Sequence, residues 1–313
     1  YISGGTLTTT GQAATISGIS AGIYTQDFEL TGGTVNANSV DAGEALSIGI
    51  QSTKTLKIID GTLNATSGDT TTDSYAIEAS GGIDVSGGVV NAVTGNADSA
   101  HGIDAERVDI TGGVVNVYNE GAASQARGIR SNNEITISGG NVQVDVGDAE
   151  SRVFGIQAGA PVSITGGKIY INTGNADGGS AIYGWGDITI ADAEVNITSK
   201  GNGIYSPGGS VIIDCTDVTV AKNYLSQEEI SKYRVYGQTG ITLSDKLTIK
   251  TPENGMIKQE QTEGEEVYSY ISSEDGTVAG KVEIVPQGYY VFIKGMSDDK
   301  QVLVPAGKSV NEV

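Results

Sequence analysis

The amino-acid sequence predicts an all-β fold: a right-handed single-stranded parallel β-helix solenoid of about ten coils with a C-terminal β cap. A repeat of about 27 residues carries this prediction, as in Gly112, Gly139 and Gly166, which lie 27 residues apart. Such a period is typical of a solenoid. Short runs of Ile, Val and Thr alternate with period two, which indicates strands. No unit carries the apolar pattern of a helix, which argues against leucine-rich, ankyrin and HEAT repeats.

Each repeat has the same three parts, most clearly in residues 155–171. A Gly-Ile pair comes first, a short run ending in two glycines follows, and a second alternating run completes the unit. The double glycine is expected at a sharp corner, because glycine accepts positive φ and close backbone approach. No glycine-rich run leads into a helix or a Lys-Ser/Thr pair, so a phosphate-binding loop is not indicated. The aligned corner positions are Gly4, Gly32, Asp60, Gly87, Gly112, Gly139, Gly166, Asp192, Cys215 and Asp245.

Alternation assigns three ladders of side chains to the interior, one on each face of the coil. A charge introduced into any ladder should be severely destabilising. The first ladder is Ile23, Ile50, Ile77, Ile103, Ile129, Ile156, Ile182 and Ile204. The second is Leu30, Ile58, Val85, Ile110, Ile137, Ile164, Ile190 and Ile213. The third is Val35, Leu63, Val90, Val115, Val142, Ile169, Val195 and Val218.

The repeat divides the chain into a β-helix over residues 1–249 and a C-terminal β segment over 250–313. In the second part the period is lost, and Asn254-Gly255 and Asp275-Gly276 are turn signals between strand-like runs. We expect this segment to cover the open end of the last coil, since exposed strand edges invite aggregation. Residues 222–236 carry a capping-box pattern, Ser226 followed by Glu229, which predicts one or two helical turns.

Composition limits the partners. The formal charge is −20, from 18 basic and 38 acidic residues, which argues against nucleic acid and disfavours polyanionic glycans unless a cation bridges them. Cys215 is the only cysteine, so no internal disulfide can form. No run approaches the ~20 apolar residues of a membrane span. The chain opens in mid-repeat, so we expect a fragment of a larger multi-domain chain, monomeric, and extracellular, either secreted or attached to a bacterial cell wall.

One outward column contains the first candidate binding site. Tyr183, Tyr205 and Tyr236 are expected to stack on successive coils, with Trp185 nearby, and such a row can stack against pyranose rings. The alternative is a tyrosine ladder that stabilises strands through cross-strand pairs. Glu78, Asp104 and Arg130 are consecutive in the same column and are expected to form a solvated ion cluster. The full column is Tyr24, Gln51, Glu78, Asp104, Arg130, Gln157, Tyr183, Tyr205 and Tyr236.

A second outward column is rich in amides, which can hydrogen-bond to one another along the solenoid axis. A structural role accounts for it. The column is Asn36, Asn64, Asn91, Asn116, Gln143, Tyr170 and Asn196.

The acidic loops form the second candidate site, for calcium, which prefers clustered carboxylate and carbonyl oxygens. Two loops on neighbouring coils, residues 147–151 and 173–178, could bring four ligands together: Asp148, Glu150, Asn175 and Asp177. Neither loop fits an EF-hand or a glycine-rich nonapeptide repeat, and calcium is the only cofactor that the sequence suggests.

The stacked I-T-G-G-x-V-x-V units, each preceded by Gly-Ile, resemble the right-handed parallel β-helix superfamily of pectate lyases and polygalacturonases. They look most like repeat proteins of clostridial and other gut Firmicutes surfaces. The resemblance covers roughly residues 1–249 and implies carbohydrate binding, with calcium in some relatives. The catalytic patterns of the superfamily are not found. The only histidine, His101, occupies the position of Arg127 and Phe154 in later coils and is interpreted as a coil-edge residue.

Three functions follow from these observations. The leading hypothesis is a non-catalytic cell-surface β-helix that binds a polysaccharide or glycoconjugate, with calcium as a candidate cofactor. The second is a structural stalk or adhesin module of a larger surface protein. The third is a polysaccharide lyase or glycoside hydrolase, which would require carboxylates and an Arg or Lys to converge in one groove.

Overall fold

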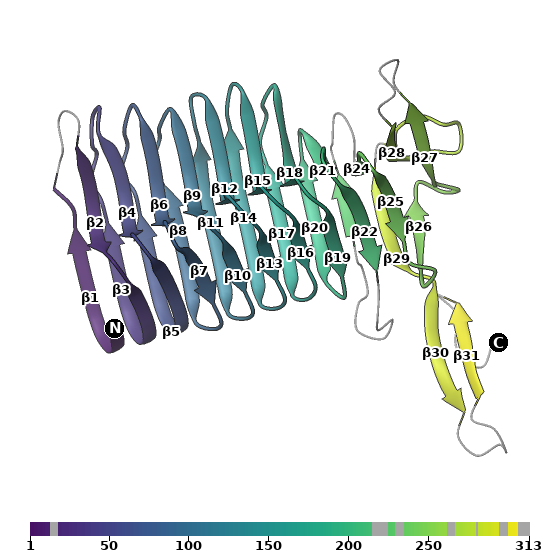
Figure 1. The fold of residues 1–313 in the computed structure, drawn as a ribbon, viewed down its shortest axis with the longest axis horizontal. Coiled ribbons are helices and arrows are strands. Elements are labelled where there is room, and N and C mark those ends of the chain that lie inside the picture. The colour runs from purple at the N-terminus through teal and green to yellow at the C-terminus, as the bar shows by residue number, and fades with distance from the viewer. Residues whose placement is uncertain are drawn as a thin grey trace.

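The chain forms a parallel β-solenoid in the computed structural model, with strands of successive coils stacked along one axis (Figure 1). The structure describes residues 1–12, 18–214, 225–228, 235–261, 267–279, 281–293 and 300–305. All the regular secondary structure in these ranges is β, and the strands of successive coils pair in parallel, so the predicted class of an all-β parallel solenoid is confirmed. No helix in the described ranges is long and apolar enough to cross a membrane.

An eleven-stranded sheet runs along the molecule and contributes one strand to each coil. In the described residues, eight successive parallel pairings join nine of its strands. The regular solenoid therefore has about eight turns. The nine strands are β2 (Ile19–Thr25), β4 (Leu46–Ser52), β6 (Asp73–Ala79), β9 (Ser99–Ala105), β12 (Gln125–Ser131), β15 (Arg152–Ala158), β18 (Gly178–Gly184), β21 (Asn202–Ser206) and β24 (Val235–Gly237).

An eighteen-stranded sheet supplies the other two faces of the coil. Three long strands run through both faces and join them: β1 (Ile2–Thr10), β3 (Phe28–Asn38) and β5 (Thr55–Thr66). One face continues as β7 (Gly82–Val85), β10 (Val108–Ile110), β13 (Ile135–Ile137), β16 (Val162–Ile164), β19 (Ile188–Ala191), β22 (Ser210–Asp214) and β25 (Gly240–Leu243). The other continues as β8 (Val89–Thr94), β11 (Val114–Gly121), β14 (Asn141–Asp148), β17 (Lys168–Thr173), β20 (Glu194–Ser199) and β23 (Leu225–Glu228).

The predicted corners lie between these two faces. The second glycine of the pair has positive φ, 83° at Gly140 and 86° at Gly167, as the corner requires. Where the pair is replaced, Asp192 takes φ of 51°, a conformation that aspartate tolerates better than most residues. The corner at Cys215 lies outside the described residues, and strand pairing after Asp245 becomes antiparallel. The count of coils is for these reasons lower than the predicted ten.

The three interior ladders are confirmed by burial and by register. Ile110, Ile137 and Ile164 pair in succession across β10, β13 and β16, and Ile137 is 0% exposed. Ile23, in the first complete coil, is only partly buried, and Val218 lies outside the described residues. The remaining ladder members are all buried in one continuous apolar core.

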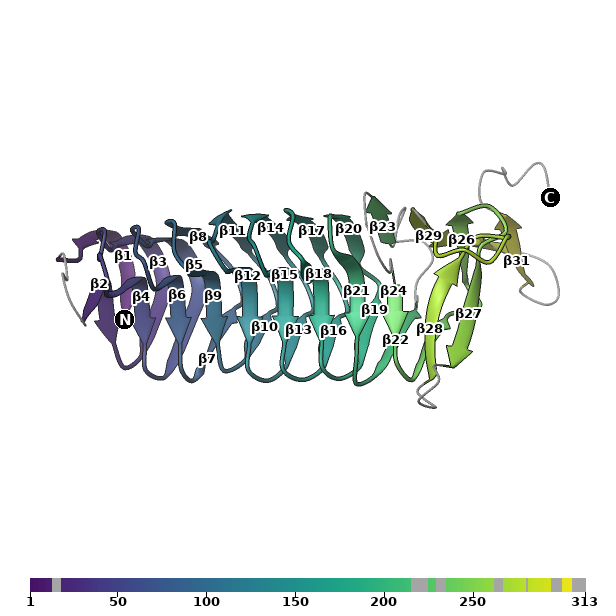
Figure 2. The same ribbon diagram turned by 90° about the horizontal axis from the view of Figure 1, so that it is seen from above.

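The last coil is followed by antiparallel strands, seen at the C-terminal end in Figure 2. These strands are β26 (Leu247–Thr251), β27 (Met256–Gln261), β28 (Val267–Ser272) and β29 (Val282–Pro286), with β30 (Gly288–Ile293) and β31 (Lys300–Pro305) as a separate hairpin. β28 pairs with β24 and β27, and β29 pairs with β23 and β26. Two of the three faces of the last coil thus gain an antiparallel neighbour.

The helix predicted from Ser226 is wrong for the part of the segment that the structure describes. Residues 225–228 form strand β23, which pairs with β20 on one side and with β29 on the other. Two neighbouring strands supply its backbone hydrogen bonds, so the local capping pattern is overridden by tertiary pairing. Glu229 and residues 230–234 lie outside the described residues.

Candidate functional site

The outward side of strands β4 to β24 is bent rather than flat, and we refer to it as the bent face. The Nδ1 of His101 lies 2.9 Å from Oδ2 of Asp104, three residues further along β9. In a regular strand, side chains three residues apart point to opposite faces. The contact therefore shows that the strand bends between them, at Gly102 and Ile103.

The Gly-Ile pair makes this bend possible. Gly102 and Ile103 are both buried, so two consecutive residues face the interior. A Cβ atom on Gly102 would lie 2.1 Å from Cγ1 of Val117, which leaves room only for glycine. Because the residues before and after the pair then both point outward, each coil contributes two neighbouring side chains to the bent face.

Two outward columns result. The predicted column from Tyr24 to Tyr236 is confirmed by the strand register. A second column lies beside it. The sequence showed that His101, Arg127 and Phe154 occupy equivalent positions in successive coils, but it did not show that this column contacts the first. Its members are Ile48, Tyr75, His101, Arg127 and Phe154.

Ionic and polar groups converge at the centre of the bent face. Nη1 of Arg130 donates to Asp104, with its two carboxylate oxygens at 2.9 and 2.7 Å. Asp104 is 7% exposed and His101 is 5% exposed, and the ring of Tyr75 stacks on His101 at 4.6 Å between centroids. The expected solvated ion cluster is therefore wrong for Asp104, which is buried. His101 lies within strand β9, not at the edge of a coil.

Burial and neighbouring charges set the protonation of this cluster. Burial alone would raise the pKa of Asp104, but His101 and Arg130 hold it below its usual value. Burial, with further help from Arg127 and Arg130, lowers the pKa of His101 in spite of Asp104. Burial and the charge of Asp104 raise the pKa of Glu78. At neutral pH the cluster contains an ionised Asp104 and a neutral histidine, whose Nε2 faces Nη1 of Arg127 at 3.1 Å.

The tyrosine row is a stacked ladder. Ring centroids are 6.0 Å apart for Tyr183 and Tyr205, and 4.6 Å apart for Tyr205 and Tyr236. The row continues into the C-terminal strand β28 through Tyr268 and Tyr270, which sequence reasoning missed because β28 carries no repeat signal. Each ring stacks on the next, and the hydroxyl groups of Tyr268 and Tyr270 both donate to Glu260. The geometry favours the cross-strand ladder interpretation for Tyr205 and Tyr236.

A hollow of about 390 Å³ lies where the polar cluster meets the tyrosine row. Trp185, in the turn after β18, borders it and is 59% exposed. Of the four predicted sugar-binding aromatics, the hollow brings together Tyr183 and Trp185, whereas Tyr205 and Tyr236 are not among its lining residues. The side chains that border it with them are Arg130, Ser131, Asn132, Gln157 and Ala158.

Comparison of the chain with protein-family models, with curated proteins and with solved structures finds no match. The chemistry of the bent face and of the loops is therefore what bears on function.

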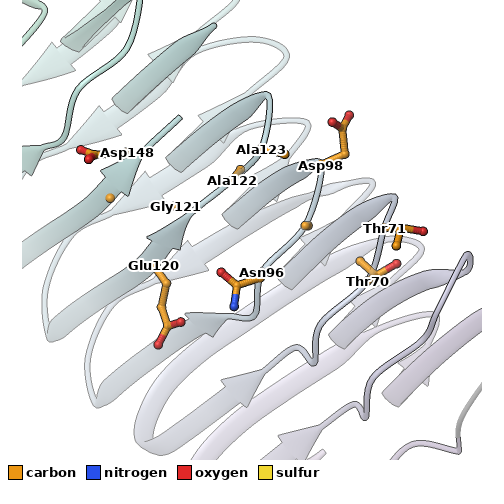
Figure 3. Close-up of a pocket in the computed structure, with 11 residues that line it drawn as sticks. Thr70, Thr71, Asn96, Asp98, Glu120, Gly121, Ala122, Ala123 and Asp148 are labelled. Atoms are coloured by element: carbon orange, nitrogen blue, oxygen red, sulfur yellow. The ribbon is translucent and has the colours of Figure 1, made fainter. Parts of the chain in front are cut away.

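The acidic loops line two open hollows along one edge of the solenoid. The first, of about 850 Å³, is bordered by residues from Thr70 to Asp148, and Figure 3 shows Asp98, Glu120 and Asp148 pointing in different directions. The second, of about 750 Å³, is bordered by all four predicted calcium ligands: Asp148, Glu150, Asn175 and Asp177. Within the described residues, no group of three or more His, Cys, Asp or Glu side chains is placed to hold a metal ion.

Several of these acidic side chains have a structural role. Oδ1 of Asp148 accepts hydrogen bonds from the backbone N–H of Asn175 at 2.7 Å and from its side-chain amide at 3.1 Å. Asp69 likewise accepts the N–H of Asn96 at 2.8 Å. Glu150 and Asp177 are joined only through their backbones, at 3.1 Å. The carboxylates of Asp148 and Asp69 thus each accept hydrogen bonds from the loop of the next coil.

The amide column behaves as predicted over its first four members. Each side-chain amide donates to the previous asparagine at 2.7–2.8 Å, from Asn116 back to Asn36. The ladder ends at Gln143, whose amide turns to Asp145 of its own strand at 2.7 Å. These amides are satisfied by one another, which supports the structural interpretation.

Proposed function

We propose that this chain is a non-catalytic bacterial cell-surface β-helix that binds polysaccharide on the bent face, at the hollow beside Trp185. The observation that carries the proposal is the exposure of Trp185, 59%, at the border of a hollow that also contains Tyr183 and Gln157. An indole offers a flat apolar surface to the C–H face of a pyranose. The amide and guanidinium groups nearby can hydrogen-bond to sugar hydroxyls, the mixture typical of small-molecule sites.

The resemblance of the repeat to the pectate-lyase-like superfamily supports this proposal, and we propose on the same ground that the protein is extracellular, either secreted or bound to the wall. Calcium is a separate part of the proposal. The loops at Asp148 and Asn175 are acidic and open, but they lie along another edge of the coil, so calcium would support binding there independently of Trp185.

The test is binding of the whole chain to plant, host and microbial glycans, with calcium and with a chelator. Trp185→Ala should weaken binding about tenfold or more, because it removes the one open aromatic face of the hollow. Tyr24→Ala is the matched control: Tyr24 lies in the same outward column, far from the hollow, and is 65% exposed. Equal binding by wild type and Trp185→Ala would refute the site. Loss of binding with chelator would assign a role to the acidic loops.

Absence of binding to any glycan would favour the second hypothesis, a stalk or adhesin module that projects other domains.

A polysaccharide lyase or hydrolase is the third candidate, and one observation favours it. Glu78, Asp104 and Arg130 do converge on the bent face together with His101. Their burial opposes it, since His101 is 5% exposed and a general base must reach the proton that it removes. Shortening of a glycan by wild type and not by Asp104→Asn would establish this function in place of simple binding.

A further inference from the structure

Arg127 is a cation on the bent face with no acidic partner. In the described residues its guanidinium makes hydrogen bonds only to neutral acceptors: Nε donates to Oε1 of Gln157 at 2.9 Å and Nη2 donates to Oε1 of Gln125. Nη1 faces Nε2 of His101 at 3.1 Å. By contrast, Arg107 pairs with Asp84 and Arg130 pairs with Asp104. The charge of Asp104 acts on Arg127, but that carboxylate is already paired with Arg130, so Arg127 has no direct ion pair in a chain of net charge −20.

The guanidinium is held in place from three coils. Gln125 belongs to its own strand β12, while His101 and Gln157 lie on the neighbouring strands β9 and β15. These contacts fix Arg127 before any ligand arrives, and a preorganised guanidinium loses less entropy on binding. His101 must be neutral to accept from Arg127, in agreement with the lowering of its pKa by burial.

A second arginine without an acidic partner lies beside it. Arg152 is exposed at the start of β15, in register with Gln125, and makes no ion pair with any residue that the structure describes. Burial and Arg130 lower the pKa of Arg127 most and the charge of Arg152 lowers it further, whereas Asp104 and Tyr75 raise it. Arg127 and Arg152 therefore repel each other. Four of the five arginines lie between residues 107 and 152, and no lysine occurs between Lys57 and Lys168. The basic groups of this stretch are therefore all guanidinium groups.

We infer that Arg127 and Arg152 bind an anionic group of a saccharide, a carboxylate or a sulfate ester, directly and without a bridging cation. Guanidinium groups suit the planar or tetrahedral oxygens of such groups. Gln157 connects this pair to the hollow, because it both accepts from Arg127 and borders the hollow with Trp185. A sugar on Trp185 would then place its charged substituent toward the arginines. The inference rests on the proposed function and reverses the expectation, from net charge alone, that acidic glycans need a bridging cation.

The test compares three galactose-based oligosaccharides of matched length: a neutral galactan, a sulfated galactan and an oligogalacturonate. All are measured with chelator present, at low and at high salt. At low salt at least one anionic oligosaccharide should bind about tenfold more tightly than the neutral one, and the difference should shrink at high salt. Which of the two binds more tightly distinguishes a sulfate from a carboxylate ligand.

Arg127→Gln and Arg152→Gln should remove the preference for the anionic sugars, whereas Arg107→Gln, which changes an arginine already paired with Asp84, should keep it. Arg152 is exposed, so its variant tests the inference even where Arg127→Gln fails to fold. Equal affinity for neutral and anionic sugars, or an unchanged preference in Arg152→Gln, would overturn the inference while leaving the Trp185 site intact. Absence of binding to all three would overturn the inference, and absence of binding across the wider glycan panel would overturn the proposed function as well.

Discussion

Asp104 and His101 have lowered pKa values for different reasons. Asp104 is ionised in the folded protein because Arg130 and His101 outweigh its burial. His101 is neutral because burial outweighs its contact with Asp104. Removal of either residue should destabilise the folded protein, since it leaves the other buried group without its partner. The cluster thus links the stability of the central coils to protonation.

His101 should make folding stability fall between pH 7.5 and 5.5. Its folded pKa lies below the ordinary value of 6.5, so the unfolded chain takes up the proton first. The stability that the neutral form contributes is present above about pH 6.5 and is lost as pH falls toward the folded pKa. Urea unfolding at pH 7.5, 6.5 and 5.5 should show this loss in wild type and a flatter dependence in His101→Gln. The assignment is direct because the chain has one histidine.

Glu78→Gln provides the control for this experiment. The pKa of Glu78 is raised by burial and by Asp104. Protonation of Glu78 therefore stabilises the folded protein as pH falls, whereas protonation of His101 destabilises it. The Gln variant should therefore keep the decline below pH 6.5 or steepen it. A wild-type profile in His101→Gln would contradict the assignment to the buried imidazole.

The Gly-Ile bend is the element that builds the bent face, and its glycine is matched to the opposite wall of the coil. A Cβ atom on Gly128 would lie 2.2 Å from Cγ1 of Val144. Two coils earlier, alanine replaces this glycine at Ala76, and the residue 16 positions later is Ala92 instead of a valine. The contact distance at Gly128 indicates that it shares one volume with Val144, although a later coil accommodates Ala181 with Ile197 16 positions on.

Gly128→Ala should destabilise the protein by about 1–3 kcal/mol, because overpacking forces neighbouring groups to move. Val144→Ala in the same chain should recover part of the loss, since it recreates the combination present at Ala76 and Ala92. Urea unfolding of the two single variants and the double variant gives the coupling between the sites. Additive effects would show that the Cβ clashes with the backbone oxygen of Gly155, 2.6 Å away, and not with the valine.

Period two in the sequence was sufficient to predict the ladders, because each inward residue must lie on a packed face and a slip of one residue would expose them all. The same reasoning predicted the column that contains Asp104 and Tyr205. It could not predict the contact of His101 with Asp104, since alternation treats residues three apart as facing opposite sides. The bend becomes visible only when Gly102 and Ile103 are both seen to face inward.

Strand β23 and the extended tyrosine ladder could not be predicted from the sequence for a related reason. Both depend on antiparallel strands outside the repeat: β29 beside β23, and β28 with Tyr268 against Tyr236. Pairings between segments that share no repeat leave no periodic signal. The hollow at Trp185 likewise combines residues from three coils, and only the stacking of those coils brings Arg130 and Tyr183 to its border.

At the scale of the whole molecule, the solenoid is nearly one-dimensional, and each coil packs mainly on the coils before and after it. Stability in such a protein is approximately a sum of coil and interface contributions. A central coil has two packed interfaces, whereas the first complete coil has a less protected interior, as the partial burial of Ile23 shows. The effect of one substitution should therefore depend on its position along the axis.

Ile137→Asp tests this position dependence. Ile137 is 0% exposed between Ile110 and Ile164, and an isolated carboxylate there costs several kcal/mol or more, so the variant should not fold. Ile23→Asp should cost less, because a partly exposed carboxylate keeps some of its hydration. Thr136→Asp, on the outward side of the same strand as Ile137, is the control and should remain folded. Circular dichroism and thermal melting distinguish these outcomes.

A soluble Ile137→Asp variant with the wild-type melting curve would contradict the inward assignment of the ladder. Equal losses in Ile137→Asp and Ile23→Asp would show that the coils unfold as one cooperative unit whatever the position of the charge.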